Sequence, residues 1–227
     1  MEYVEIARAE TERGELVLRE RRSENAPTSL ELRANGVFVM DTVEVSTEQA
    51  LAESALEVVE DPRAVVVGGL GFGFTMHAVL RDSRVEKCTV VEIEQALVDW
   101  MRDGTVPHGP GVLADERVTV VVADIAVAIA EAPPASYDLV LLDVDNGPGY
   151  LVHDANAELY RAPFLQSVRD MLRPGGALVV WSSAAAPGLL DEMRTVFGNA
   201  CEQTHPVRLQ ERDDRYYLYT ARVPSDA

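Results

Sequence analysis

The pattern of hydrophobic and polar positions changes near residue 46 and divides the chain into two parts. Before it, hydrophobic and polar residues alternate, as in Tyr3-Val-Glu-Ile-Ala7 and Glu15-Leu-Val-Leu-Arg19, which is typical of strands with one buried face. Asn35-Gly36 stands between two further extended segments and favours a two-residue hairpin turn, because both residues tolerate positive φ. The sequence therefore predicts a small antiparallel β unit over residues 1–45.

From residue 46 onward, strand patterns alternate with helical ones. Ser46 or Thr47 can cap a first helix, and Pro62 marks its end. The later alternation indicates βαβ units, hence a mostly parallel sheet with helices on both faces. The predicted strands are 64–67, 89–93, 118–122, 137–143, 177–181, 201–209 and 216–222; the predicted helices are 73–81, 95–102, 125–131, 156–172 and 187–197, with a Gly- and Pro-rich loop at 104–111.

The two closing strands predict an antiparallel hairpin at one edge of this sheet. Residues 46–227 are therefore expected to form a Rossmann-like α/β domain with a seven-stranded, mostly parallel sheet. In such a sheet, ligands bind at the carboxyl ends of the strands. The residues that follow each strand are thus the candidates for function.

Closely spaced glycines follow the first of the parallel strands. Gly68, Gly69, Gly71 and Gly73 stand at the turn into the next helix, where glycine permits unusual backbone angles and lets a ligand approach the backbone amides. Glu92 ends the next strand, about 20 residues later, where a carboxylate can accept hydrogen bonds from ribose hydroxyls. Together these features predict a nucleoside-binding site.

An acid also follows the strand at 118–122. Asp124 could accept a hydrogen bond from the exocyclic amine of a purine, while the backbone amide of Ile125 contacts the ring. Taken alone, Asp124 is equally well explained as the N-cap of the next helix. Both interpretations stay open.

The loop that follows the strand at 137–143 carries the candidate catalytic residues. Its glycines and proline predict a rigid loop that holds Asp143 and Asn146 over a reacting centre, with Asp145 between them. Asp143 is the candidate base, because a carboxylate can take a proton from an amine, whereas an Asn side chain can only hydrogen-bond. Tyr150 and His153 follow the loop and could reach a substrate.

Charge and composition exclude several other classes of protein. A formal net charge of −18 argues against binding nucleic acid through its phosphates and is compatible with a cationic small acceptor, although it also simply favours solubility. No apolar run approaches the roughly 18 residues that span a bilayer, and the N-terminus lacks the pattern of a signal peptide. Cys88 and Cys201 fit a reducing compartment, so a cytoplasmic protein without membrane contact is expected. Neither the His spacing nor the Cys spacing predicts a metal site.

These motifs resemble the spermidine synthase family, within the S-adenosylmethionine-dependent methyltransferase fold. The resemblance implies a donor that is S-adenosylmethionine or its decarboxylated form, a small amine acceptor contacted by Glu48 and Tyr160, and a homodimer. It rests on Gly68-Gly-Leu-Gly-Phe-Gly73 in place of a GGGDGG turn, Val91-Glu92-Ile93-Glu94 at the ribose, Asp124 at the adenine, Leu142-Asp-Val-Asp-Asn-Gly-Pro148 as the catalytic loop, Leu159-Tyr160, and Leu172-Arg-Pro-Gly-Gly176.

Two departures from the family pattern bear on the reaction. Gly71 stands where the aminopropyl-transferring members carry an Asp that contacts the amine of the decarboxylated donor. Where those members carry Asp-Glu followed by a Tyr and a His or Gln that hold the polyamine, this chain has Thr47, Glu48, Leu51 and Ala52. Glu48 and Glu53 alone survive.

The departures narrowly favour methyl transfer from S-adenosylmethionine, by in-line displacement at a carbon bonded to the sulfonium. Aminopropyl transfer from decarboxylated S-adenosylmethionine to a polyamine is the alternative. A catalytically inactive module that binds the nucleoside, and less favourably a nicotinamide-dependent dehydrogenase, also stay open.

Overall fold

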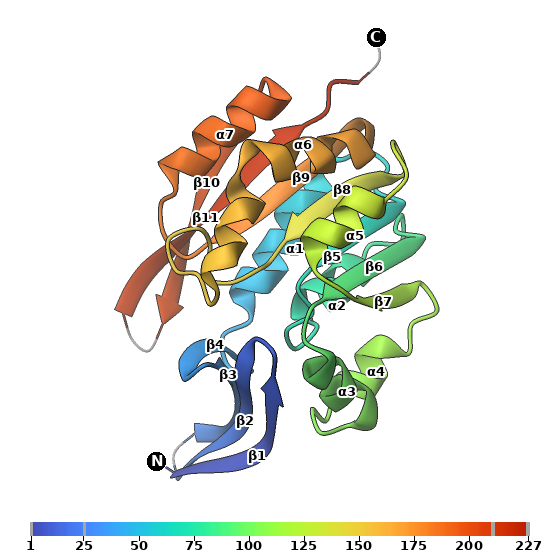
Figure 1. The fold of residues 1–227 in the computed structure, drawn as a ribbon. Helices are drawn as coiled ribbons and strands as arrows, with labels where there is room; N and C mark the ends of the chain where they lie inside the picture. The colour runs from blue at the N-terminus through green and yellow to red at the C-terminus, as the bar shows by residue number, and fades with distance from the viewer. Residues whose placement is uncertain (1, 25, 210–211, 226–227) are drawn as a thin grey trace.

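The N-terminal residues form a separate four-stranded antiparallel sheet. A computed structural model describes residues 2–24, 26–209 and 212–225, and in it the strands follow the order β1 (Glu2–Thr11), β2 (Gly14–Ser23), β3 (Ala26–Ala34), β4 (Val37–Asp41). Figure 1 shows this sheet in blue below the main body of the molecule. Asn35 and Gly36 connect β3 to β4 with φ of 51° and 75°, so the predicted hairpin turn is confirmed.

The second sheet has seven strands in the order β10-β11-β9-β8-β5-β6-β7. Five of them pair in parallel: β5 (Ala64–Gly68), β6 (Lys87–Glu92), β7 (Val118–Val122), β8 (Tyr137–Leu142) and β9 (Leu172–Ser182). The hairpin of β10 (Cys201–Leu209) and β11 (Arg212–Arg222) completes one edge, with β11 antiparallel to β9. The predicted α/β fold, with its mostly parallel sheet and antiparallel edge hairpin, is therefore confirmed.

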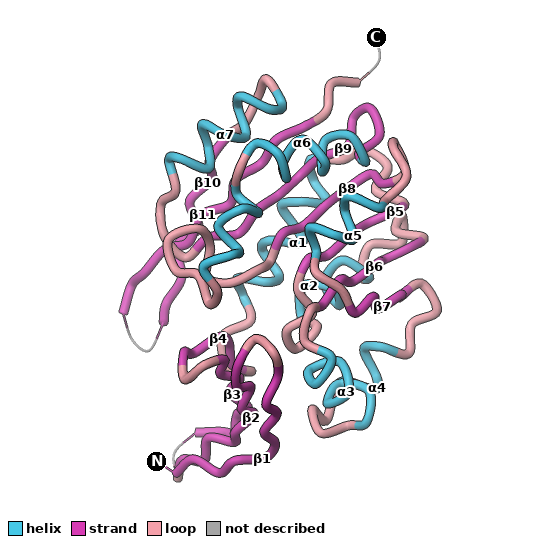
Figure 2. The backbone as a smooth tube through the Cα atoms, viewed as in Figure 1, coloured by secondary structure: helices cyan, strands magenta, loops and turns pink. Residues whose placement is uncertain are grey.

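Helices cover both faces of this sheet (Figure 2). The elements α1 (Ser46–Val58), α2 (Phe74–Leu80) and α3 (Gln95–Asp103) contribute to one hydrophobic core, and α5 (Ile125–Glu131), α6 (Ala162–Met171) and α7 (Pro187–Phe197) to the other. Successive side chains of β5 point to opposite faces, so Val65 and Val67 join the first core and Val66 joins the second. Both faces are apolar, which explains why the strands read as continuous hydrophobic runs.

Several predicted boundaries are wrong for local reasons. The single helix expected over 156–172 is a 3₁₀ helix, η1 (Asp154–Tyr160), followed by α6, because Pro163 lies in the first turn of α6 and cannot continue a preceding helix. The loop expected at 104–111 contains the start of α4 (Gly109–Leu113). The motif at 172–176 does not separate a helix from a strand but forms the first part of β9.

The predicted cap of α1 is also wrong. Its N-cap position is Val45, and no side chain caps the helix there. The Ser46 hydroxyl donates instead to the Glu44 carboxylate, and the Thr47 hydroxyl donates to Glu48. Among the described residues, no helix has both the length and the apolar character needed to cross a bilayer.

One buried carboxylate joins three strands at the end of the sheet away from the glycine turn. Asp138 on β8 accepts hydrogen bonds from the backbone amide of Ala64 on β5, at 2.7 Å, and from Arg173 on β9, at 2.8 and 2.9 Å. Removing this side chain leaves the partly buried amide of Ala64 without its acceptor and Arg173 without its partner.

We therefore expect Asp138→Ala to lower the free energy of unfolding by about 2 kcal/mol or more, because of the unsatisfied Ala64 amide. Urea denaturation measures the change. Asp191→Ala is the matched control, since Asp191 forms only an exposed 3.7 Å pair with Arg194 and should change stability by less than about 0.5 kcal/mol. Equal effects of the two substitutions would contradict this account of Asp138.

Candidate functional site

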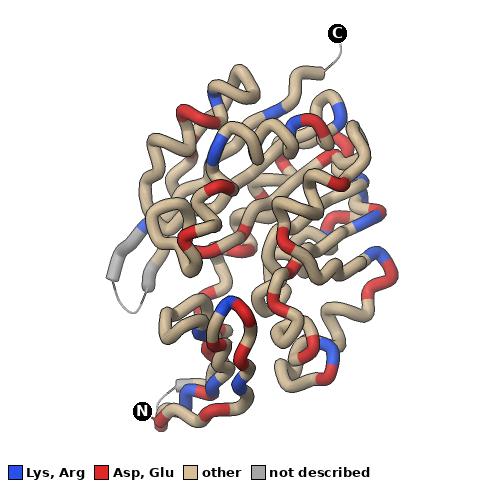
Figure 3. The backbone as a smooth tube through the Cα atoms, viewed as in Figure 1, with Lys and Arg blue, Asp and Glu red and all other residues tan. Residues whose placement is uncertain are grey.

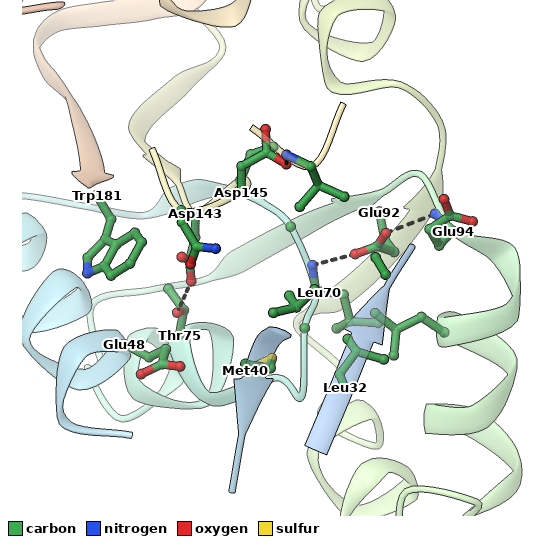
Figure 4. Close-up of a pocket in the computed structure, with 18 of the residues that line it drawn as sticks. Leu32, Met40, Glu48, Leu70, Thr75, Glu92, Glu94, Asp143, Asp145 and Trp181 are labelled. Carbon is green, nitrogen blue, oxygen red and sulfur yellow. Dashed lines mark hydrogen bonds between the residues drawn. The ribbon is translucent and has the colours of Figure 1, made fainter. Parts of the chain in front are cut away.

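A cavity of about 700 Å³ lies between the N-terminal sheet and the carboxyl ends of the parallel strands. Figure 4 shows its central part. Most of the residues singled out from the sequence line it together: Glu48, Gly69, Gly71, Glu92, Ile93, Asp124, Ile125, Asp143, Asp145, Asn146 and His153. Gly68, Gly73, Tyr150 and Tyr160 do not line it.

The glycine turn brings the end of β8 close to the end of β5. Gly69 has a φ of 97°, and a Cβ atom at this position would lie 2.3 Å from the carbonyl oxygen of Asp143. The amide of Asp143 donates in turn to the carbonyl of Gly68, at 2.9 Å. Only glycine fits at residue 69, and its contact fixes the backbone position of the candidate base.

Glu92 is buried and holds the glycine turn. One carboxylate oxygen accepts from the amide of Leu70 at 2.9 Å and the other from the amide of Glu94 at 2.8 Å, as Figure 4 shows. Burial raises the pKa of Glu92, and these backbone hydrogen bonds oppose the shift. A carboxylate has about four lone-pair sites, so Glu92 keeps acceptor capacity for a ligand hydroxyl.

Asp124 serves as a helix cap and also lines the cavity. Its carboxylate accepts from the amide of Ala126 at 2.8 Å, which makes it the N-cap of α5. The capping interpretation therefore holds for one oxygen, and the proposed contact of this residue and of Ile125 with a purine ring stays a prediction.

Asp143 lines the cavity and is partly buried by the surrounding protein. The hydroxyl of Thr75, in the first turn of α2, donates to its Oδ2 at 2.7 Å. Burial raises the pKa of Asp143, and the Thr75 hydrogen bond lowers it by a smaller amount. A carboxylate whose pKa is raised toward neutrality is suited to accept a proton.

Other candidates near Asp143 hold its loop in place. Asp145, at a φ of 56°, accepts from the amide of Val152 at 3.2 Å and from the Asn156 side chain at 2.8 Å. Tyr160 donates its hydroxyl to the carbonyl of Val144 at 2.9 Å, and the Ser183 hydroxyl donates to the carbonyl of Asn146 at 2.6 Å. Asp145 and Tyr160 thus act in this structure through the loop, and Tyr150 is 62% exposed outside the cavity.

The part of the cavity that lies around Asp143 and α1 is acidic. Glu48 on α1 lies near Asp143, as Figure 4 shows, and Glu44 lines the same wall. Burial, and then the charge of Asp143, raise the pKa of Glu48 from its ordinary 4.5 to about 7. Neither Glu48 nor Asp143 forms an ion pair with any residue in the described part of the chain.

Two cavity residues that no sequence motif singles out come from opposite sides of the cavity. Arg13, in the turn between β1 and β2, places its Nε 3.6 Å from a Glu94 carboxylate oxygen and donates through Nη2 to the Asn156 side chain at 3.3 Å. Trp181, at the end of β9, lies beside Asp143 (Figure 4), and its buried Nε1 has no hydrogen-bond partner among the described residues. No local pattern marks either residue, because both contacts depend on tertiary structure.

Among the described residues, no group of three or more His, Cys, Asp and Glu side chains is arranged to hold a metal ion. Acidic side chains nevertheless dominate the chain as a whole, with 38 Asp and Glu against 20 Lys and Arg. Figure 3 shows acidic positions distributed over both parts of the molecule. The cavity therefore lies in a protein whose net field attracts cations.

Comparison with known proteins agrees with this arrangement. Residues 44–207 match the family model described as the spermine/spermidine synthase domain. The chain belongs to the spermine/spermidine synthase family. The resemblance stated from the sequence is thus confirmed at the level of the family.

Curated relatives of two kinds match parts of the chain. Putrescine N-methyltransferase 3 of Nicotiana tabacum is 33% identical over 122 residues, which are 53% of this chain and 30% of that protein. Polyamine aminopropyltransferase 2 of Hyperthermus butylicus is 32% identical over 155 residues, 66% of this chain and 48% of that protein. The matches thus span half or less of the length of these relatives.

A solved structure supports the fold over nearly the whole chain. Spermidine synthase from Thermotoga maritima superposes with a TM-score of 0.79 at 17% identity, covering 98% of this chain and 74% of that one. At this identity the match speaks for the fold and not for the reaction.

The Thr75 hydrogen bond gives a testable prediction about the candidate base. Thr75→Val removes the hydroxyl at nearly constant volume, so the pKa of Asp143 should rise, because its ionised form loses a donor. Carbon-13 NMR of the Asp143 carboxyl measures the titration. Thr75→Ser keeps the donor and is the matched control; a pKa that is the same in the Val and Ser proteins would contradict this role.

Proposed function

We propose that this chain transfers an aminopropyl group from decarboxylated S-adenosylmethionine to a cationic amine. The observation that carries the proposal is the pair Asp143 and Glu48. Both carboxyls line the cavity, both have raised pKa values, and neither has a cationic partner in the described part of the chain. Buried carboxylates of this kind are stabilised by a bound cation.

The charge of this end of the cavity favours a donor without a carboxylate. Of the three described arginines that line the cavity, Arg13 lies near Glu94, Arg21 lies 3.5 Å from Asp41, and Arg215 precedes Tyr216 on β11. Asp143, Glu48 and Glu44 still make the field acidic around the place where the donor tail meets the acceptor. Such a field attracts the ammonium of a decarboxylated donor and repels the carboxylate of S-adenosylmethionine.

The comparisons bear on the acceptor. The relatives named above carry polyamine or putrescine in their names, and the positive charges of such an amine complement the acidic side chains of the cavity. We therefore assign a small di- or polyamine as the acceptor class. A homodimer and a cytoplasmic location stay predictions from the sequence.

The reaction requires that the acceptor nitrogen is aligned with the donor carbon and that the acceptor loses one proton. The reacting ammonium first loses a proton to Asp143, which gives a neutral nitrogen with a free lone pair. This nitrogen attacks the tail carbon bonded to the sulfonium, opposite the sulfur; the N–C bond forms as the C–S bond breaks, and the electron pair of that bond stays on sulfur as a neutral thioether. Glu48 orients the acceptor, and Glu92 holds the ribose of the donor.

Methyl transfer is the second candidate, and Gly71 is the observation that favours it. Residue 71 provides no carboxylate for the amine of a decarboxylated donor, so the sequence taken alone favours methyl transfer. The family match and the acidic cavity support aminopropyl transfer better, and the curated relatives include both kinds of enzyme.

The dehydrogenase is disfavoured, because a pyrophosphate would need free amides in the turn, whereas those of Leu70 and Phe72 already donate to Glu92 and Met40.

Labelled donors test the proposal. Incubation with each labelled donor and a panel of amines should give an aminopropylated amine from the decarboxylated donor alone. Asp143→Asn should lower turnover by about 10²-fold or more, because the base is lost, while donor affinity is kept; the exposed Asp191→Asn should change neither. A methylated product from S-adenosylmethionine, or no transfer from either donor, would contradict the proposal.

The raised pKa of Glu48 predicts how binding depends on pH. The pKa is higher in the folded protein than in the unfolded chain, so ionising Glu48 destabilises the ligand-free fold progressively as pH rises from about 4.5 to about 7. A cation favours the ionised form, so putrescine binding should strengthen as pH rises toward about 7 and should release a proton below that pH.

Calorimetry in buffers of different ionisation enthalpy measures this proton release. Glu48→Gln should bind putrescine more weakly and release fewer protons near neutral pH. Proton release that is unchanged in the Glu48→Gln protein would show that another group titrates.

A further inference from the structure

We propose that Met40, on β4 of the N-terminal sheet, forms the wall of the site beside the donor tail, in the space that a side chain at residue 71 would take. The proposal rests on the proposed function and names a residue that no sequence motif singles out. Met40 lies over the glycine turn and accepts a hydrogen bond at its Sδ from the amide of Phe72, at 3.3 Å. The N-terminal sheet therefore contacts the turn directly through this thioether.

Met40 occupies the space that a side chain at residue 71 would need. A Cβ atom on Gly71 would lie 2.7 Å from the Met40 Sδ and 3.3 Å from its Cε. Gly71 also has a φ of 50°, in the left-handed region that most side chains disfavour. No contact to a donor can come from a side chain at residue 71 while Met40 lies there, so this part of the wall is formed by Met40.

The position of Met40 in the cavity places it beside the donor tail. Figure 4 shows Met40 between Glu92 on one side and Asp143 with Glu48 on the other. A donor with its ribose at Glu92 and its reacting carbon near Asp143 extends along this line. The chain that leaves the sulfonium therefore passes the thioether.

A thioether recognises a tail differently from a carboxylate. Methionine sulfur is polarisable and uncharged, and it packs against alkyl chains without fixing an ammonium. At Met40 the site thus contacts the apolar part of the tail, and the discrimination between the two donors comes from the more distant acids. A carboxylate introduced at residue 40 would add a direct partner for an ammonium and a direct repulsion for a carboxylate.

Met40→Glu with Met40→Gln as its matched control tests the proposal. The two side chains have the same shape, and either can accept from the Phe72 amide, so they differ only in charge. The measured quantity is the ratio of the dissociation constants for S-adenosylmethionine and decarboxylated S-adenosylmethionine, by calorimetry. Met40→Glu should shift this ratio toward the decarboxylated donor by about tenfold or more relative to Met40→Gln, as expected for one charge-assisted contact.

The outcomes separate this inference from the proposed function. If the unsubstituted protein binds neither donor, the proposed function fails. If it binds a donor but the Glu and Gln proteins give the same ratio, Met40 does not lie at the tail and only this inference is wrong. Met40→Leu keeps an apolar wall, so it should alter both constants in parallel; a changed ratio in this protein would also overturn the inference.

Substitutions at residue 71 test whether Met40 occupies that space. Gly71→Asp should lower the melting temperature, because its Cβ atom would overlap the thioether. Combining Gly71→Asp with Met40→Ala should recover part of the lost melting temperature. The double variant should bind decarboxylated S-adenosylmethionine more strongly than S-adenosylmethionine. If the decrease in melting temperature of the double variant equals the sum of the decreases caused by the two single substitutions, the side chains do not compete for the same space.

Discussion

The close contact between Gly69 and the backbone of Asp143 is the constraint on which the site depends. Parallel pairing brings the ends of β5 and β8 to the same edge of the sheet, and the lack of a side chain at Gly69 lets them meet. The turn then leads into α2, whose first turn presents Thr75 to the Asp143 carboxylate. One glycine thus determines where the base lies, and the neighbouring helix influences its pKa.

The N-terminal sheet completes a site that the α/β domain only half forms. Leu16, Leu18 and Leu32 belong to the same hydrophobic core as α1 and β5, so the sheet is anchored to the rest of the chain by burial. Its remaining contacts are directed at the cavity, where Arg13 approaches Glu94 and Met40 accepts from the glycine turn. The walls contributed by the sheet differ in character: a charged contact lies at Glu94 and a thioether lies over the glycine turn.

The sequence predicted the parts of this structure that depend on local pattern. Continuous apolar strands, Asn35-Gly36 and the acids at strand ends each have a short-range cause, and Glu92, Asp124 and Asp143 indeed share one cavity. The break between η1 and α6 at Pro163 was not predicted, because the residues on both sides of the proline continue a regular helical pattern. Met40, Trp181 and Arg13 could not be predicted, since an isolated Met, Trp or Arg acquires its role only when the two sheets meet.

The acidic end of the cavity links binding to the proposed chemistry. Without a ligand, the charge of Asp143 opposes the ionisation of Glu48, so at neutral pH the site holds fewer negative charges than it has carboxyls. A bound ammonium removes that opposition, because its attraction offsets the repulsion between the carboxylates. Arrival of a cationic acceptor therefore favours the ionised state in which a base can act. A neutral acceptor lacks this effect, so the same two residues that would catalyse the transfer also select the charge of the acceptor.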